Sequence, residues 1–295
     1  MKYTRGIQSA LLIGLLLFAA PTADAQPTTS EPQMVNVGGR MMRALIAGME
    51  RRKPGQPALI LEAGAGAGLD EWSPVFLELA RLAPVVSYDR RGIGQSEIDT
   101  QPQNYRRVAQ SLHDLLTAIR IPPPYILVGH SFGAMYIRGF SEMFPEAVVG
   151  YVYVEAFDFD GTPEEKAAAF PESERAQALA PPVLPPVPPD TPPGLLAEIE
   201  FLKGEMLRGG VEGRKLQQKP GVPVAVIIAA PPGRLKHPGE ITLRLQVKHQ
   251  SEWALQSSKG LFIVSGDTGH NVAKDAPDLV LLAVRHVLRN VPAAK

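Results

Sequence analysis

A serine with one glycine two residues before it and another two residues after it is the feature of this sequence that points most directly to chemistry. Residues 129–133 read Gly-His-Ser-Phe-Gly, between the apolar run 126–128 and a helical pattern over 134–140. Glycines suit a strand-to-helix turn this tight, because the neighbouring backbones pack too closely for side chains. Such a turn lifts the hydroxyl clear of the sheet, at a helix N-terminus that favours negative charge. We predict that Ser131 is a catalytic nucleophile; the alternative is a serine that caps an ordinary helix.

A hydroxyl placed in this way needs a rigid sheet behind it, and the rest of the sequence predicts one. Short runs that are apolar on both faces alternate with segments whose apolar residues recur at helical spacing. Buried parallel strands and the helices that connect them show this alternation. The predicted fold class is therefore α/β, with a mostly parallel sheet flanked by helices. We expect strands at 58–61, 85–88, 125–128, 150–154, 222–229 and 261–264, and helices at 72–82, 105–119 and 279–287.

One segment, residues 158–218, interrupts this alternation. It has no strand pattern, and residues 181–193 include eight prolines in thirteen positions. Proline at this density prevents a packed helix or a central strand and favours extended surface structure. Helices are expected on either side, over 162–180 with a break at Pro171 and over 195–207. Because long insertions in compact α/β domains usually serve a site, we predict a cap or lid; the alternative is a surface loop.

The serine motif and its setting resemble the nucleophile elbow of the α/β-hydrolase fold family. The resemblance extends over residues 34–290. It implies a serine hydrolase, for which no metal and no organic cofactor is expected. It implies a hydrolase core of 34–157 and 219–295, with residues 158–218 inserted as the cap. Besides the serine motif, the resemblance rests on the Gly-rich turn in 58–68, the segment 88–96, in which Asp89 and Arg90 are structural, and Gly269-His270.

The resemblance also indicates which histidine activates the serine. A serine hydroxyl is a poor nucleophile at neutral pH and needs an adjacent base. Of the six histidines, His270 follows the predicted strand 261–264 after a short loop and precedes the last helix, as the family's catalytic histidine does. His130 adjoins the nucleophile but is expected to point elsewhere. We expect His270 to take the Ser131 proton; the alternative is a loop histidine without a role.

The acid of the predicted triad departs from the family's commonest pattern. No carboxylate follows the strand 222–229 until Glu240, eleven residues beyond it. A known variant places the acid one strand earlier, where Glu155 follows the strand 150–154. This segment resembles the one that carries the catalytic acid in haloalkane dehalogenases. We therefore predict that Glu155 accepts a hydrogen bond from the far nitrogen of His270, fixes its tautomer and stabilises the imidazolium.

Other assignments of the acid stay open. Asp158 is the second choice, since it follows the same strand. Asp267 ranks third, because it lies three residues from His270 and cannot easily reach around the ring. Glu155 could also be a strand-end glutamate that only pairs with a cation.

Two backbone amides are expected to bind the oxygen of the tetrahedral intermediate. One belongs to Phe132, directly after the nucleophile. By resemblance, the other follows the first Gly-rich strand, usually within a His-Gly turn, and here Ala63 stands where that histidine usually lies. Counting from Trp72 as an anchor assigns the amide of Ala65. A phosphate-binding Gly loop is set aside, because the spacing fits neither of its common motifs.

Composition and the N-terminal residues address partners and location. The formal net charge is zero, so no nucleic-acid partner is indicated, and the histidines lack the paired spacing of a metal site. The chain has no cysteine, which excludes a thiol nucleophile.

Two basic residues, an apolar run over 10–20 and a small-residue site ending at Ala25 predict a signal peptide over 1–25. We expect a flexible leader over 26–33 and a periplasmic or secreted protein without a stable membrane partner; the alternative is an uncleaved anchor.

Together these features predict an exported serine hydrolase that cleaves a carboxylic ester through an acyl-enzyme on Ser131. The composition of the cap suggests a neutral or apolar small-molecule ester. Amidases, lactonases, carbon–carbon bond hydrolases and perhydrolases use the same residues. A binding protein without turnover also stays open, because no acid directly follows residue 229. An epoxide hydrolase or a dehalogenase would need an aspartate at position 131 and is excluded.

Overall fold

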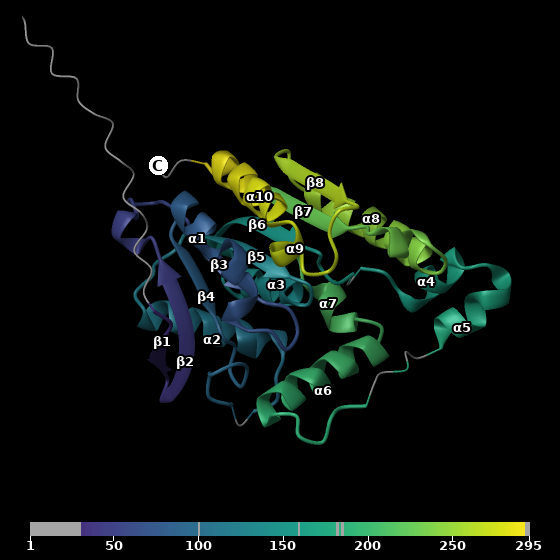
Figure 1. Ribbon diagram of the computed structural model, residues 1–295, viewed down its shortest axis with the longest axis horizontal. Helices are drawn as coiled ribbons and strands as arrows, with labels where there is room; N and C mark the ends of the chain where they lie inside the picture. Colours follow the sequence, from purple (N-terminus) through teal and green to yellow (C-terminus); the bar gives the residue numbers. More distant parts are fainter. Residues whose placement is uncertain (1–30, 100, 159, 181–182, 184–185, 293–295) are drawn as a thin grey trace, which may run out of the picture.

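An eight-stranded sheet crosses the molecule (Figure 1). The computed structural model describes residues 31–99, 101–158, 160–180, 183 and 186–292. The strands lie in the order β1-β2-β4-β3-β5-β6-β7-β8. Strand β2 pairs antiparallel with β1 and β4, and the other neighbouring strands are parallel. This topology confirms the predicted α/β class with a mostly parallel sheet.

The strands and helices have the following bounds. The strands are Gln33–Val37 (β1), Arg40–Ala47 (β2), Ala58–Glu62 (β3), Val85–Tyr88 (β4), Tyr125–His130 (β5), Val148–Val154 (β6), Val224–Ala229 (β7) and Gly260–Ser265 (β8). The helices are Ser73–Leu82 (α1), Tyr105–Ala118 (α2), Gly133–Met143 (α3), Pro163–Ala169 (α4), Arg175–Leu179 (α5), Pro193–Leu207 (α6), Val211–Lys215 (α7), Gly239–Leu255 (α8), Val272–Asp275 (α9) and Pro277–Asn290 (α10).

The six predicted strands are all present, as β3 to β8. Every residue of β3, β4, β5 and β7 is buried. Helices cover both faces of a parallel sheet, so its central strands need apolar side chains on both sides. The short apolar runs of the sequence therefore marked these strands reliably.

The sequence prediction misses the β1–β2 hairpin. Gln33, the last residue of the predicted leader 26–33, is instead the first residue of β1. Gly38 and Gly39, with φ of +61° and +84°, form the turn of the hairpin. Much of β1 is exposed and β2 is only partly buried, so neither strand shows the continuous apolar run of a buried strand. The predicted signal peptide 1–25 and the leader up to residue 30 lie outside the described residues.

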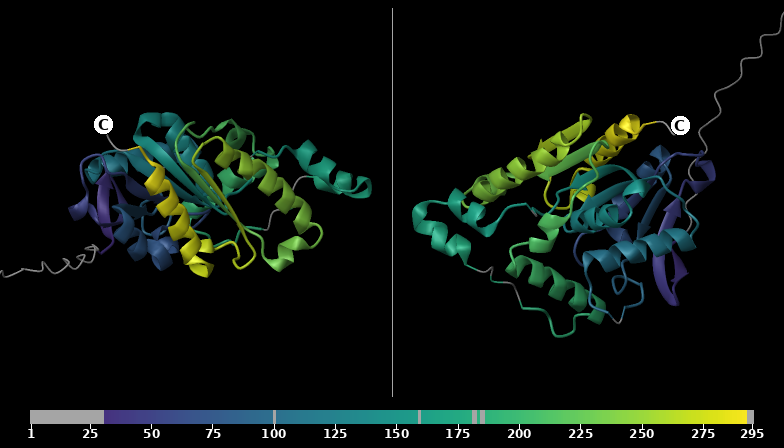
Figure 2. Two further views of the ribbon diagram at one scale, coloured as in Figure 1. Left: turned by 90° about the horizontal axis from the view of Figure 1, so that it is seen from above. Right: turned by 180° about the vertical axis from the view of Figure 1, so that it is seen from behind.

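Helices form a layer on each face of the sheet (Figure 2). Helices α1, α9 and α10 pack on one face, in an apolar cluster that includes Trp72 and Val284. Helices α2, α3 and α8 pack on the other, in a cluster that includes Phe140 and Trp253. The helical spacing along 105–119 has its origin here, because one side of α2 is buried in this second cluster. No helix within the described ranges is long and apolar enough to cross a membrane.

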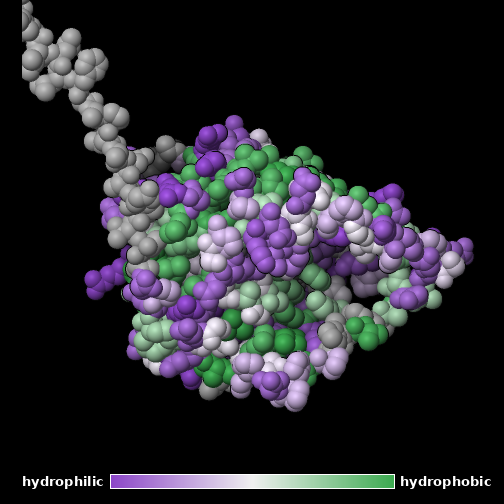
Figure 3. Space-filling view, viewed as in Figure 1, coloured by the Kyte–Doolittle hydropathy of each residue, from purple (hydrophilic) through white to green (hydrophobic). Residues whose placement is uncertain are grey.

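Between β6 and β7 the chain leaves the sheet for the segment 158–218, which we call the cap segment. Its described residues contain helices α4 to α7 and no strand. Helix α4 begins as predicted, since the Thr162 side chain accepts a hydrogen bond from the Glu165 N–H at 3.1 Å and Pro163 follows the cap. Helices α4 and α5 form an arm at one end of the molecule, and α6 lies beside the body (Figure 1). The space-filling view shows a hollow between this arm and the body (Figure 3).

Replacing Phe140 tests the packing of α3 against its neighbours. Its side chain is fully buried. We expect Phe140→Ala to lower the free energy of unfolding by about 3–5 kcal/mol, because the lost ring leaves a cavity. Leu77→Ala is the control, since Leu77 on α1 is exposed and should contribute less than about 0.5 kcal/mol. Chemical denaturation measures both variants, and equal free energies of unfolding would contradict the packing described.

Candidate active site

The turn between β5 and α3 holds Ser131 in a left-handed backbone conformation. Its φ is +50°, which stores about 1–3 kcal/mol of strain in a residue other than glycine. A Cβ on Gly129 would lie 2.9 Å from Cδ1 of Ile137, and a Cβ on Gly133 would lie 2.6 Å from the carbonyl oxygen of Glu62. Both glycines are therefore needed for the close packing around the serine, as the sequence predicts.

The loop after β8 brings His270 to the serine. Nε2 of His270 lies 3.0 Å from Oγ of Ser131, across 139 positions of sequence. Desolvation lowers the pKa of His270 most; the charges of His130 and Arg234 lower it further, whereas that of Glu71 raises it. A lowered pKa keeps the imidazole neutral near pH 7, and only the neutral ring can accept a proton. The structure thus brings together the predicted nucleophile and the predicted base.

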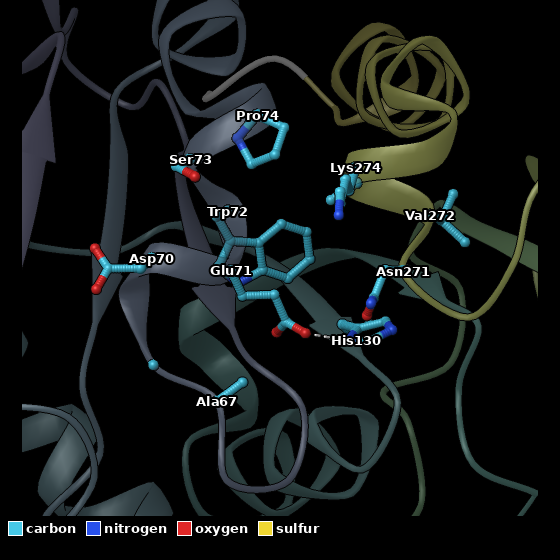
Figure 4. Close-up of a pocket in the computed structure, with 12 residues that line it drawn as sticks. Ala67, Asp70, Glu71, Trp72, Ser73, Pro74, His130, Asn271, Val272 and Lys274 are labelled. Atoms are coloured by element: carbon cyan, nitrogen blue, oxygen red, sulfur yellow. Dashed lines mark ion pairs between the residues drawn. The ribbon is translucent and has the colours of Figure 1, made fainter.

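His130 joins the serine turn to the loop of His270, a contact that the sequence analysis missed. Its Nδ1 lies 2.7 Å from a carboxylate oxygen of Glu71 (Figure 4). Its Nε2 donates to the carbonyl oxygen of His270 at 2.8 Å. Burial lowers the pKa of His130, but Glu71 and that carbonyl outweigh burial and raise it overall. The other Glu71 oxygen accepts a hydrogen bond from the Gly64 N–H at 2.8 Å. Both ring nitrogens of His130 face acceptor oxygens, an arrangement that favours the protonated ring. His130 therefore fixes the backbone of His270, and the centroids of the two rings lie 4.7 Å apart.

Glu155 makes other contacts than the one predicted for it. Its carboxylate is buried and accepts hydrogen bonds from the Ala229 N–H at 2.5 Å and from the Arg234 guanidinium at 2.7 Å. Burial raises the pKa of Glu155, although the Ala229 N–H and Arg234 partly offset this effect. Among the hydrogen bonds of the described residues there is none between Glu155 and His270. The pairing with Arg234 instead matches the alternative of a strand-end glutamate bound to a cation.

The two alternative acids also bond to residues other than His270. Both carboxylate oxygens of Asp158 are 3.0 Å from Nδ1 of His249, on helix α8. Asp267 is exposed, and its own N–H donates to the Ser265 hydroxyl at 3.3 Å. Within the described residues, none of the three predicted acids forms a hydrogen bond or an ion pair with His270. The identity of the acid therefore stays a prediction.

The turn after β3 passes directly over the nucleophile. A Cβ on Gly64 would lie 3.3 Å from Cβ of Ser131. The next residue, Ala65, is exposed, and its N–H donates no hydrogen bond to another described residue. Phe132 follows Ser131 at the start of α3. Ala65 thus directly follows a residue that packs against Ser131, and Phe132 directly follows Ser131 itself; their role in an oxyanion hole stays a prediction.

A cavity opens at the nucleophile. It has a volume of about 280 Å³, and a second cavity of about 440 Å³ in the cap segment shares Phe157, Asp158 and Lys166 with it. In the part of the chain that the structure describes, no three His, Asp or Glu side chains form a cluster that could hold a metal ion. The polar and charged residues that line the first cavity are Ser131, Glu155, Asp158, Lys166, Arg234, Thr242, Gln246 and His270.

The comparison with known families decides the family of the chain. Residues 59–283 match the model of a family described as the alpha/beta hydrolase family, which is well over half of the sequence. The chain belongs to the alpha/beta hydrolase family. The family predicted from the serine motif is thereby confirmed, and membership supports hydrolase activity.

Relatives of this alpha/beta hydrolase match it over part of their length. The AB hydrolase superfamily protein of Gibberella zeae is 34% identical over 115 residues, which are 38% of this chain and 36% of that protein. The putative carbamate hydrolase RutD of Enterobacter cloacae is 35% identical over 105 residues, 35% of this chain and 39% of that protein. Each match thus spans less than two fifths of the relative. The enol-lactonase from Burkholderia xenovorans LB400 has the same fold, with a TM-score of 0.59, 18% identity, and coverage of 87% of this chain and all of that one.

Removing the charge of His130 should shift the pH dependence of any activity that needs neutral His270. The imidazolium of His130 lowers the pKa of His270, so His130→Asn should raise it. The acidic limb of the kcat/KM profile should then move to higher pH, because a His270 with a higher pKa becomes neutral, and so able to accept the proton, only at higher pH. His286→Asn, at a half-buried histidine on α10 that contacts the Lys259 carbonyl oxygen, should leave the limb in place. A limb that stays fixed or moves to lower pH in His130→Asn would contradict the electrostatic role of His130.

Proposed function

We propose that this chain is an exported serine hydrolase that cleaves a carboxylic ester through an acyl-enzyme on Ser131. The observation that carries the proposal is the contact between the strained Ser131, whose Oγ the turn presents, and Nε2 of His270 at 3.0 Å. Nucleophile and base within hydrogen-bond distance are the minimum unit for this chemistry. Ester cleavage is the least demanding reaction that such a unit performs.

The proposed reaction has two steps. Neutral His270 takes the Ser131 proton while Oγ attacks the ester carbonyl, and the amides of Ala65 and Phe132 stabilise the oxyanion. The tetrahedral intermediate collapses, His270 returns the proton to the leaving alcohol, and the acyl group stays on Ser131. His270 then activates a water molecule that releases the acid and restores the serine. No metal or organic cofactor takes part in this proposal.

Glu155 remains the proposed acid of the triad. It lines the same cavity as Ser131 and His270, and its strand is bonded to the serine turn, since the Ser131 N–H donates to the carbonyl of Val154 at 3.1 Å. Arg234 favours the ionised carboxylate, the form that would stabilise a protonated His270. In this proposal Glu155 exchanges part of its contact with Arg234 for His270 during the reaction.

The two cavities, which share Phe157, Asp158 and Lys166, support a neutral ester with an apolar part. Glu155 and Asp158 in the cavity at Ser131 are paired with Arg234 and His249, so neither carboxylate is left to select a cationic substrate. Carbon-rich side chains, among them Leu179 and Met206, line the cavity in the cap segment. The substrate would place its ester at Ser131 and extend its apolar part into this second cavity.

Export rests on the N-terminal pattern alone. Two basic residues, the apolar run 10–20 and the small residues before position 26 support a signal peptide over 1–25 and a periplasmic or secreted enzyme. An intact mass that still includes residues 1–25 in the mature protein would contradict this proposal.

Labelling with a fluorophosphonate tests the nucleophile. The wild-type protein should react at a single serine and hydrolyse p-nitrophenyl esters. Ser131→Ala should lose both properties, and His270→Ala should lower kcat by about 10³-fold or more, because the serine then lacks its base. Ser141→Ala, at a buried serine on α3, the helix that follows the serine turn, is the control and should keep the label. No labelling of the wild type would refute a serine hydrolase.

Two substitutions separate a catalytic Glu155 from a structural one. Glu155→Gln should lower kcat by about 10²–10⁴-fold, since the imidazolium loses its stabilising charge. Arg234→Gln should retain far more activity, because the freed carboxylate can still serve His270. Asp158→Asn is the control for a neighbouring carboxylate and should change kcat by less than about threefold. Equal losses in Glu155→Gln and Arg234→Gln would mean that the pair is only structural.

A further inference from the structure

A buried cluster of charges joins the cap segment to the turn over the nucleophile. Arg90, Glu62 and Glu198 are 2%, 1% and 1% exposed. Arg90 pairs with Glu62 at 2.7 Å and with Glu198, on cap helix α6, at 2.8 Å. A charge this deep is tolerated only where its hydrogen bonds are complete. The hydroxyl groups of Tyr88 and Tyr136 complete them, one on each glutamate.

Arg90 also forms hydrogen bonds with the backbone of the turn after β3. Its guanidinium donates to the carbonyl oxygen of Gly64 at 2.7 Å and to that of Ala63 at 2.9 Å. The peptide unit between Gly64 and Ala65 is planar and trans, so the Ala65 N–H points opposite to the Gly64 carbonyl. Holding that carbonyl from the buried side therefore aims the Ala65 N–H away from Arg90. A charged donor on the carbonyl also polarises the peptide and strengthens its N–H as a donor.

Glu198 holds the other side of the same turn. One of its carboxylate oxygens accepts from the Arg90 Nε at 3.0 Å, and the other accepts from the Gly66 N–H at 2.9 Å. Ala65 thus lies between two peptide groups that this cluster fixes. The cap helix that carries Glu198 is itself firmly docked: a Cβ on Gly194 would lie 2.1 Å from the carbonyl oxygen of Gly92. Only glycine permits this approach of α6 to the turn that follows Arg90.

We propose that Arg90 and Glu198 are positioning residues that aim the Ala65 amide at the oxyanion, so that cap helix α6 is a fixed part of the oxyanion hole. This inference rests on the proposed serine-hydrolase function. It assigns helix α6 a second role beside its place at the cap cavity. Glu198 completes the catalytic machinery, whereas Met206 and Leu207 at the end of α6, together with the α4–α5 arm, border the cavity that would take the apolar part of the substrate.

The test compares two buried glutamates of the same helix. In Glu198→Gln either orientation of the amide points an NH₂ group at a donor, because both carboxylate oxygens accept hydrogen bonds. Glu205, which is 2% exposed, also accepts with both oxygens, and its donors among the described residues are Arg208, Glu212 and Gly213, all inside the cap segment. Glu205→Gln therefore matches the burial and the chemical change without touching the turn. Arg90→Lys keeps the positive charge but loses the guanidinium geometry that lets Arg90 donate to two carbonyl oxygens. This variant replaces Glu198→Gln in the test if Glu198→Gln does not fold.

The readouts are kcat and KM for p-nitrophenyl acetate and the inhibition constant of a boronic acid, which forms a tetrahedral adduct. Glu198→Gln and Arg90→Lys should lower kcat by about 10–10³-fold and weaken the boronic acid in parallel, with KM changed by less than about threefold. Glu205→Gln should keep kcat within about threefold. Equal kcat in Glu198→Gln and Glu205→Gln would overturn the positioning role while leaving the serine hydrolase intact. A wild type without turnover dependent on Ser131 would overturn both.

Discussion

The arrangement of the site depends on how closely the serine turn approaches the end of β3. No side chain fits between them, because a Cβ on Gly133 would lie within 2.7 Å of the carbonyl oxygens of both Glu62 and Ala63. At this approach the turn after β3 lies over Ser131, and Ser131 itself has a left-handed backbone conformation. A larger residue at position 133 would push the two segments apart and separate Ser131 from its proposed oxyanion donors.

Charge around this contact is distributed in two layers. Nearest the reaction, the charged His130 holds the backbone of His270 and favours its neutral ring. Deeper in the molecule, Arg90 is fully enclosed by Glu62 and Glu198, whose charges raise its pKa despite burial. Both layers act on the same turn, since Glu71 binds the Gly64 N–H and Arg90 binds the Gly64 carbonyl. The chain therefore fixes one peptide segment from both sides with charged hydrogen bonds, which are stronger than neutral ones.

Local patterns predicted the fold and part of the site. The strands β3 to β8 are apolar on both faces, and two glycines around a serine, between a strand and a helix, are typical of one kind of tight turn. His270 could be chosen because its place in the chain order of the family is distinctive. The β1–β2 hairpin was missed because it lies at the sheet edge and is largely exposed.

Contacts set by the tertiary structure could not be predicted from the sequence. The pair of Arg90 and Glu198 is separated by 108 positions, and nothing in the cap sequence distinguishes Glu198 from Glu205 before α6 is docked. The contact of Glu155 with Arg234 likewise depends on how the loop after β7 places Arg234 against the end of β6. The periodicity of the strands does not predict the path of that loop.

The central claim is that ester cleavage passes through an acyl group on Ser131. Acid quenching of the wild-type protein during turnover of p-nitrophenyl acetate, followed by mass spectrometry of its peptides, tests this claim most directly. The account predicts an added acetyl group on the peptide that contains Ser131, and its absence from that peptide in His270→Ala. Turnover accompanied by an acetyl group on another residue, or by no acylated peptide at all, would contradict it.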